Sequence, residues 1–144
     1  MKFTLDNKEM TDGFFEDARL LGIQSPTKDY MFCWQINNLM GVDFRISNVV
    51  EIPLRRKERT YYFPVYEYAQ PSTCLMHYLY NNQHEGEYLL PEFRHLDFLW
   101  LLKDDFVSDE FLDNLVYSIR SLAGVQLVVE LTNEKIKNKE HLVF

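Results

Sequence analysis

The chain has 144 residues, a length that fits one domain with a sizeable hydrophobic core. Its 15 Lys and Arg residues are outnumbered by 22 Asp and Glu residues, which gives a formal net charge of -7. A field of that sign repels nucleic acid and anionic membrane surfaces, so we expect neither as a partner.

The N-terminal third predicts a strand followed by a helix. Residues 1–17 are mixed in character and indicate an irregular segment, whereas residues 18–24 are apolar enough for a strand. Ser25 and Pro26 suit the N-cap and first position of a helix over residues 26–40. Its apolar positions recur at helical spacing, and they are Phe32, Ile36, Leu39 and Met40. Gly41 is expected to end this helix.

The middle of the chain predicts further strands. Residues 42–46 follow the helix as a short strand, and residues 48–60 are expected to be a solvated loop. Residues 61–69 and 73–81 are rich in strand-forming residues and indicate a hairpin. Pro64 has no N–H to donate, which favours an edge position or a bulge.

Residues 87–102 contain the most apolar pentapeptide, residues 98–102 (Phe-Leu-Trp-Leu-Leu). A strand without polar alternation is covered on both faces, so this one should lie centrally in a sheet. Residues 91–97 precede it as a turn. If they make one helical or 3₁₀ turn, Phe93 and Leu96 both point inward.

The C-terminal third predicts a second helix and a last strand. Ser108 suits the N-cap of a helix over residues 108–123, with acidic residues in its first turn. Residues 125–131 alternate in polarity and indicate a strand with one buried face. Residues 82–86 between the strands are expected to be a polar loop.

The order of elements predicts a single α+β domain over residues 1–144. Two helices cannot cover both faces of about six strands. We therefore expect a two-layer sandwich in which a mainly antiparallel sheet carries both helices on one face.

The segment Leu90-Pro91-Glu92-Phe93-Arg94-His95-Leu96-Asp97-Phe98 resembles the signature of the IPExxxDY family of small bacterial proteins. Leu21-Gly22-Ile23, the first predicted helix, Tyr66-Glu67-Tyr68 and the final Leu142-Val143-Phe144 are similar to that family as well. Leu90 and Phe98 replace the Ile and Tyr of the family name, and the second change removes a phenol hydroxyl. The resemblance implies the extent of the domain and a cytoplasmic location, but it supplies no activity.

Glu92, His95 and Asp97 lie close in the sequence, with His84 nearby. Such a group could supply acid–base catalysis or bind a metal, but the spacing matches no established motif. We favour a structural role in which Glu92 and Asp97 accept backbone N–H groups at the turn and Pro91 interrupts strand pairing.

The tyrosine-rich strands suggest a surface for association. Alternation places Tyr62, Tyr66 and Tyr68 on one face of their strand and gives Tyr78 and Tyr80 a shared face on the next. Tyrosine is enriched at protein interfaces because it joins apolar area to a polar tip. The alternative is that these side chains are covered by the two helices of the protein itself.

Three further features have plain structural interpretations. Asn37 on the first helix more readily bonds a neighbouring loop than a ligand. The basic cluster Arg55, Arg56, Lys57 and Arg59 is expected to be solvated. Cys33 and Cys74 fit two free thiols in a reducing compartment, with one disulfide between them as the alternative.

No nucleotide-binding, Walker or nucleophile-elbow motif occurs, so we expect no cofactor. No apolar run approaches the roughly 18 residues of a transmembrane helix, and the N-terminus lacks a signal-peptide apolar stretch. The sequence favours a cytoplasmic, non-enzymatic module that binds a protein or itself. The alternatives are an enzyme or metal-dependent domain using Glu92, His95 and Asp97, and a small-molecule sensor.

Overall fold

A computed structural model describes residues 9–144 of the chain, and its centre is an antiparallel sheet. The sheet has six strands in the order β2–β3–β4–β7–β1–β8, and every neighbouring pair is antiparallel. The strands are β1 Arg19–Gln24, β2 Arg45–Arg56, β3 Arg59–Ala69, β4 Met76–Asn81, β7 Phe98–Lys103 and β8 Leu127–Glu130. A separate small hairpin is formed by β5 Gln83–His84 and β6 Glu87–Tyr88.

The apolar run of residues 98–102 forms β7, which lies between β4 and β1 as predicted. All five residues are buried, because side chains from both faces of the strand enter hydrophobic clusters. Trp100 pairs with Leu21 of β1 and Leu79 of β4 and points to the same face as both. The expectation of a central strand is confirmed.

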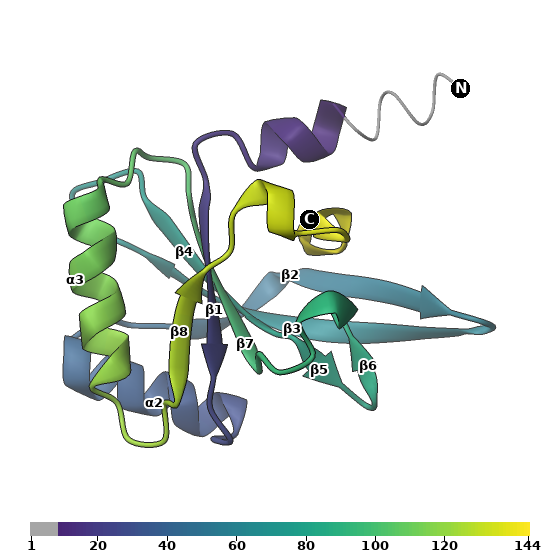
Figure 1. Cartoon of the computed structure of the whole chain (residues 1–144), viewed down its shortest axis with the longest axis horizontal. Coiled ribbons are helices and arrows are strands. Elements are labelled where there is room, and N and C mark those ends of the chain that lie inside the picture. The colour runs from purple at the N-terminus through teal and green to yellow at the C-terminus, as the bar shows by residue number, and fades with distance from the viewer. Residues whose placement is uncertain (1–8) are drawn as a thin grey trace.

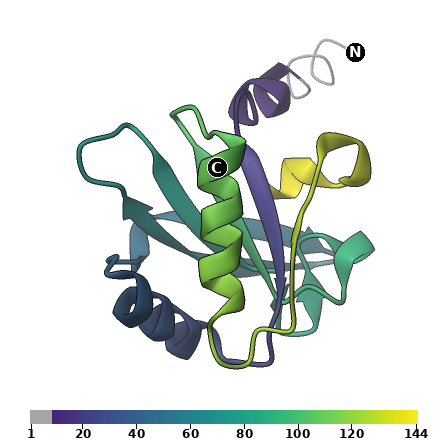
Figure 2. The ribbon, with the colours of Figure 1, turned by 60° about the vertical axis from the view of Figure 1, so that its left-hand side comes forward.

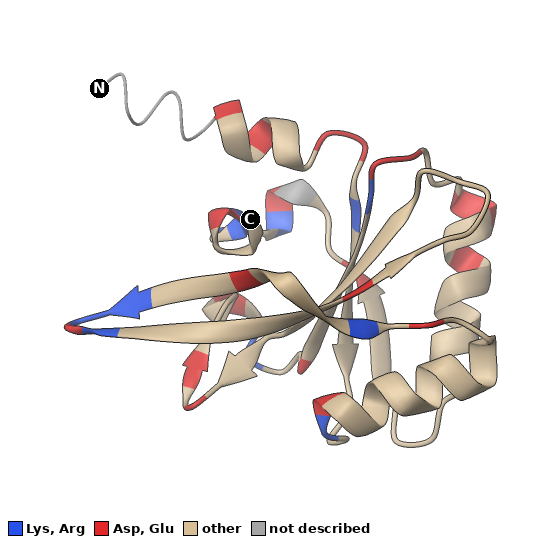
Figure 3. Ribbon diagram, turned by 180° about the vertical axis from the view of Figure 1, so that it is seen from behind, with Lys and Arg blue, Asp and Glu red and all other residues tan. Residues whose placement is uncertain are grey.

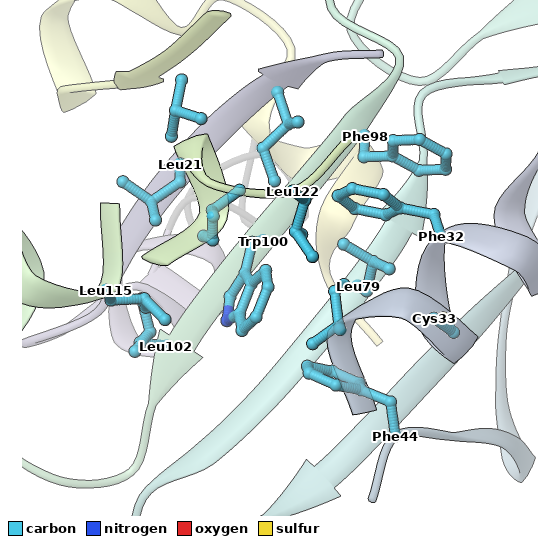
Figure 4. Close-up of a cluster of buried hydrophobic side chains, with 14 of the residues drawn as sticks. Leu21, Phe32, Cys33, Phe44, Leu79, Phe98, Trp100, Leu102, Leu115 and Leu122 are labelled. Atoms are coloured by element: carbon cyan, nitrogen blue, oxygen red, sulfur yellow. The ribbon is translucent and has the colours of Figure 1, made fainter. Parts of the chain in front are cut away.

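Both helices cover one face of the sheet, also as predicted (Figures 1 and 2). They are α2 Asp29–Met40 and α3 Asp109–Arg120. Figure 4 shows their side chains meeting those of the sheet around Trp100. The Ser108 hydroxyl accepts the N–H of Phe111 at 3.1 Å, so the expected N-cap of α3 is present. The α+β class and the placement of both helices on one side are confirmed.

The opposite face is covered by the two ends of the chain rather than by long helices (Figure 1). Phe15 lies on this face at the N-terminal end, and Ile136 and Leu142 lie there from the C-terminal end. The C-terminal segment contains the short 3₁₀ helices η2 Asn133–Lys135 and η3 Lys139–Leu142. In β8, Val128 packs under the helices, while Leu127 and Val129 face the chain ends. β8 is therefore covered on both sides, and the expectation that only one of its faces is buried was wrong.

The start of the first helix also differs from the prediction. Helix α2 begins at Asp29, and Lys28 occupies its N-cap position without a capping side chain. Ser25 is instead buried in the preceding loop, where its N–H donates to Asp97 and its hydroxyl donates to the Thr27 hydroxyl. Gly41 ends the helix in the left-handed conformation, as expected.

The region predicted as a short strand and a loop, residues 42–60, is mainly strand. Residues 42–44 are not strand; β2 starts at Arg45 and pairs with β3 as far as Arg56, so most of the expected loop over residues 48–60 is strand, and only the turn at residues 57–58 is not. Ile52 and Leu54 alternate inward and are buried, and this burial outweighs the polar character of Glu51 and Arg55 on either side of them. β3 lies between β2 and β4, so the edge position that Pro64 also suggested is wrong. The register between β2 and β3 shifts between Ile46 and Glu51, just before the Glu51–Pro64 pair, so an irregularity of the bulge type lies beside Pro64.

The N-terminal segment was expected to be irregular over residues 1–17. Residues 9–14 are helical, which corrects that expectation, and residues 1–8 lie outside the described part of the chain. Within residues 9–144, no helix is both long enough and apolar enough to pass through a membrane.

Replacing Trp100 with alanine should lower the free energy of unfolding by about 3–5 kcal/mol, because Trp100 is only 1% exposed and its removal empties a large site in the core. Urea denaturation followed by circular dichroism would measure the change. Tyr117→Ala is the matched control, since Tyr117 on α3 is 75% exposed and should shift stability by about 0.5 kcal/mol or less. A similar loss in both variants would contradict the central position of Trp100.

Candidate functional site

The segment that resembles the IPExxxDY signature forms a compact turn leading into β7. Pro91–Phe93 makes one 3₁₀ turn (η1), Leu96 is fully buried and Phe93 packs partly against the same cluster. This agrees with the predicted inward direction of both apolar residues. Leu96 lies over Gly22 of β1, where a Cβ atom would collide with the leucine side chain.

Asn82 holds this turn together, although the sequence indicated only a polar loop there. Its side chain is fully buried, and Nδ2 donates to the carbonyl oxygens of Phe93 and Leu96, at 2.9 Å each. Its Oδ1 accepts the N–H of Leu90 at 2.8 Å, and its backbone N–H donates to the carbonyl of Asp97. The amide therefore replaces the backbone partners that an irregular buried segment lacks.

Glu92 binds the C-terminal segment rather than its own turn. Its Oε2 accepts the N–H groups of Lys137 at 2.6 Å and Asn138 at 2.9 Å, and Oε1 accepts Asn138 Nδ2 at 2.8 Å. Partial burial raises the pKa of this carboxyl, but the hydrogen bonds from Asn138 and the backbone outweigh that effect and leave the pKa below its ordinary value. The predicted structural role is thus present, with partners far away in the sequence.

Asp97 also accepts a backbone group, as predicted. Its Oδ2 receives the Ser25 N–H at 2.8 Å and ties the signature turn to the β1–α2 loop. Burial raises the pKa of Asp97, and the single hydrogen bond from Ser25 offsets this only in part. Asp97 borders an open groove of about 260 Å³ beside the start of α2, together with Lys28, Asp29 and Asn81.

The structure does not bring Glu92, His95 and Asp97 together as a catalytic or metal-binding group. The two carboxylates point to different chain segments, and His95 is exposed. His84 lies near Phe63, with ring centroids 5.5 Å apart. Among the residues that the structure describes, no three His, Cys, Asp or Glu side chains are arranged to hold a metal ion.

Asp29 is the other carboxylate of the groove, and it links α2 to the sheet. Its Oδ2 accepts the Tyr66 hydroxyl at 2.8 Å and Asn81 Nδ2 at 3.0 Å. Burial raises the pKa of Asp29, but these hydrogen bonds outweigh it and the carboxyl stays ionised. Cys33 lies nearby, and burial raises its pKa to about 12, so its thiol is protonated and a weak nucleophile. The groove therefore contains a structural network without an activated nucleophile.

The amide of Asn37 binds a loop, as predicted. It donates through Nδ2 to the Phe44 carbonyl and accepts the Phe44 N–H through Oδ1, at 3.1 and 2.8 Å. Both cysteines are free thiols, with Cys33 buried and Cys74 exposed.

The five tyrosines proposed as one interaction face are divided between the two sides of the sheet. Tyr66 and Tyr68 pack against the helix side, whereas Tyr78 and Tyr80 are buried on the other side, where the Tyr80 hydroxyl donates to the Leu142 carbonyl. Tyr62 is exposed on the β2–β3 hairpin. The alternation within each strand was right, but the register pairs Tyr78 with Glu67 and Tyr80 with Val65, and paired residues share a face.

The basic cluster lies at the tip of the same hairpin (Figure 3). Arg59 pairs with Glu85 at 2.7 Å, and Arg56 approaches Glu87 at 3.9 Å. Arg55, Lys57 and Arg59 are exposed. These contacts support the prediction of a solvated cluster.

A surface that the tyrosine argument missed lies on the outer side of α2. Its large apolar side chains Tyr30, Met31, Trp34 and Leu39 are exposed, and we call these four residues the α2 face. Figure 3 shows α2 without charged positions beyond its first turn, and the sequence has none between Asp29 and Asp43. Leu39 was expected to point inward; Cys33 occupies an inner position instead. In the sequence, the feature that could have revealed the α2 face is this absence of charged residues, not the number of aromatic residues.

Comparison with protein-family models and with curated proteins finds no match to this chain. Membership of the IPExxxDY family therefore remains a proposal based on the sequence resemblance.

Glu92→Gln should lower the free energy of unfolding by about 1–3 kcal/mol, because the charged acceptor of three hydrogen bonds becomes a neutral one. Asp97→Asn should cost less, since it loses one such bond at most and removes a desolvated charge. Denaturation of each variant beside Glu58→Gln, a change at the exposed hairpin tip, gives the comparison. Equal stability of the Glu92 and Glu58 variants would contradict the role of Glu92.

His77 is a buried titratable group on the helix side of the sheet. Trp100 Nε1 donates to its Nδ1 at 3.0 Å, and its Nε2 lies 2.9 Å from Gln70 Oε1, so the proton belongs on Nε2. A second proton on Nδ1 would face the indole N–H. Burial accordingly lowers the pKa of His77 from 6.5 to about 4.

In the unfolded chain His77 binds a proton near pH 6.5, whereas in the folded chain it does so only near pH 4. The stability that neutral His77 contributes is therefore complete above pH 6.5 and is lost as the pH falls toward 4. The loss at low pH should reach roughly 3 kcal/mol. Comparing the pH dependence of unfolding in the wild type and in His77→Gln isolates this group from the carboxylates. Parallel profiles would show that His77 is not held neutral.

Proposed function

We propose that the protein is a non-enzymatic protein-interaction module that binds its partner through the α2 face. The observation that carries the proposal is an uncharged, apolar outer surface on one helix of a chain with 15 basic and 22 acidic residues. An exposed helix of a globular protein normally presents polar and charged residues to water, as α3 does. A helix that is apolar on both sides is normally covered on both sides.

The exposed positions form a continuous stripe rather than scattered residues. Tyr30, Trp34 and Asn38 are spaced four apart, as are Met31 and Gln35, and Leu39 follows at the same spacing. Trp34 is 62% exposed at the middle of this stripe. Tryptophan and tyrosine dominate the energetic centres of protein interfaces because they bury large areas with few rotatable bonds.

The chemistry of the face favours a protein surface that is itself apolar and uncharged. Nucleic acid is recognised through Lys and Arg contacts to phosphate, and α2 contains neither residue. Helices that lie on membranes combine an apolar side with basic residues, which are also absent from α2. An apolar protein surface needs no charge on this face and gains from excluding water.

The proposal keeps the interaction class expected from the sequence and moves its location from the tyrosine-rich strands to α2. It includes a cytoplasmic location, which two free thiols support, and membership of the IPExxxDY family. No described geometry favours the enzyme alternative.

If the α2 face is kept for binding, its apolar residues should not be needed for folding. Trp34→Gln and Leu39→Gln should each change the free energy of unfolding by about 0.5 kcal/mol or less at submicromolar protein. Both should elute earlier from a phenyl hydrophobic-interaction column, with Tyr117→Gln as the control for an exposed aromatic outside the face.

A loss of several kcal/mol in Trp34→Gln would mark Trp34 as a core residue and overturn the proposal. If the protein sediments with phosphatidylcholine vesicles and this depends on Trp34, the partner of the α2 face is a lipid surface and not a protein.

A further inference from the structure

We infer that the partner of the α2 face is a second copy of this chain, docked through the same face with the two α2 helices antiparallel. The inference rests on the proposed function and names its partner. In such a two-fold interface each copy contributes the same surface, so that surface must be complementary to itself in charge, shape and hydrogen bonding.

Charge permits two copies to meet here. Each chain carries -7, so most pairings of its surface would bring acidic side chains together. No charged side chain lies between Asp29 and Asp43, so contact between two α2 faces leaves the acidic residues outside. At physiological salt their remaining repulsion is screened over roughly 8 Å.

Shape supplies both a ridge and a groove on the same surface. The exposed side of α2 is the ridge, and beside it a groove of about 370 Å³ separates the C-terminal ends of α2 and α3. The groove is lined by Trp34, Gln35, Asn38, Leu39, Ser121, Leu122 and Ala123. A ridge and a groove side by side allow each copy to insert into the other.

Asn37 and Asn38, the asparagines of the helix, already have partners within the chain. Asn38 Nδ2 donates to the Trp34 carbonyl at 2.8 Å, and Asn37 is bound in both directions by Phe44. Covering these groups therefore leaves both Asn37 bonds and the Asn38 bond to Trp34 intact.

The area indicates a modest affinity. Tyr30 and Trp34 are 63% and 62% exposed, so these two side chains together can bury roughly 200–300 Å² on contact with a partner. Met31, Leu39 and the groove wall add to this, against about 800 Å² per partner in a standard interface. We expect a reversible dimer with a dissociation constant in the micromolar range.

Antiparallel helices fix which residues meet. A two-fold axis near Trp34 places Tyr30 of one copy against Leu39 of the other, next to the groove that Leu39 borders. It also sets the N-terminal end of each helix beside the C-terminal end of its partner, which is the favourable arrangement of helix dipoles.

Sedimentation velocity of the full chain from about 1 to 100 µM tests the inference. The wild type should shift from monomer to dimer, and Trp34→Glu or Leu39→Glu should raise the dissociation constant at least about tenfold. Tyr117→Glu, a charge on an exposed aromatic of α3 outside the face, should leave it within about twofold.

A double-mutant cycle tests the antiparallel arrangement. Tyr30 and Leu39 lie about 13 Å apart along one helix and cannot touch within a chain. Their alanine substitutions should nevertheless be non-additive in dimer dissociation, by about threefold or more, because they meet across the interface. Additive effects would overturn the antiparallel arrangement.

A folded wild type that stays monomeric at 100 µM would overturn the inference of self-association. The proposed function is decided separately, by the stability and the chromatography of Trp34→Gln. A dimer unaffected by glutamate at both Trp34 and Leu39 would place the second copy elsewhere and overturn the inference.

Discussion

The fold depends on how the chain turns into its central strand, and the buried amide of Asn82 controls that turn. Residues 90–97 form no strand, yet Leu90 and Leu96 are buried, so most backbone groups of this segment need partners outside the sheet ladder. Asn82 provides four of these bonds from the end of β4, the strand that pairs with β7. The same amide therefore joins the turn to the sheet and sets the point at which β7 begins.

From this turn, two carboxylates connect the rest of the molecule. Asp97 holds the β1–α2 loop on the helix side, and Glu92 holds the C-terminal segment on the other side. Because that segment is short and irregular, packing alone orders it weakly, and the charged acceptor adds directional bonds. Leu142 then lies over Tyr80, whose hydroxyl binds its carbonyl. The turn thus organises both covers of the sheet.

Much of this fold was predictable because burial leaves a direct pattern in sequence. Residues 98–102 are apolar without interruption, and α3 repeats its apolar residues at helical spacing. Interactions between distant segments were not predictable. The neighbouring residues do not show that Asn82 is buried or that the Ser25 N–H donates to Asp97 while Ser25 leaves α2 uncapped. They also do not show that the strand register places Tyr66 and Tyr78 on opposite faces of the sheet. The Glu92 role was foreseen, but its partner, 45 residues away, was not.

The two helices use their apolar residues in different ways. α3 is divided into an apolar side that packs on the sheet and a polar side that faces water, so folding accounts for its pattern. α2 buries Phe32, Cys33 and Ile36 in the same core and packs Met40 against it, which accounts for four of its eight apolar residues. The remainder, centred on Trp34, contributes nothing to the core of its own chain. Contact with another molecule, as we propose, would account for the apolar character of this side, and the sheet behind α2 would hold that surface rigid before the contact forms.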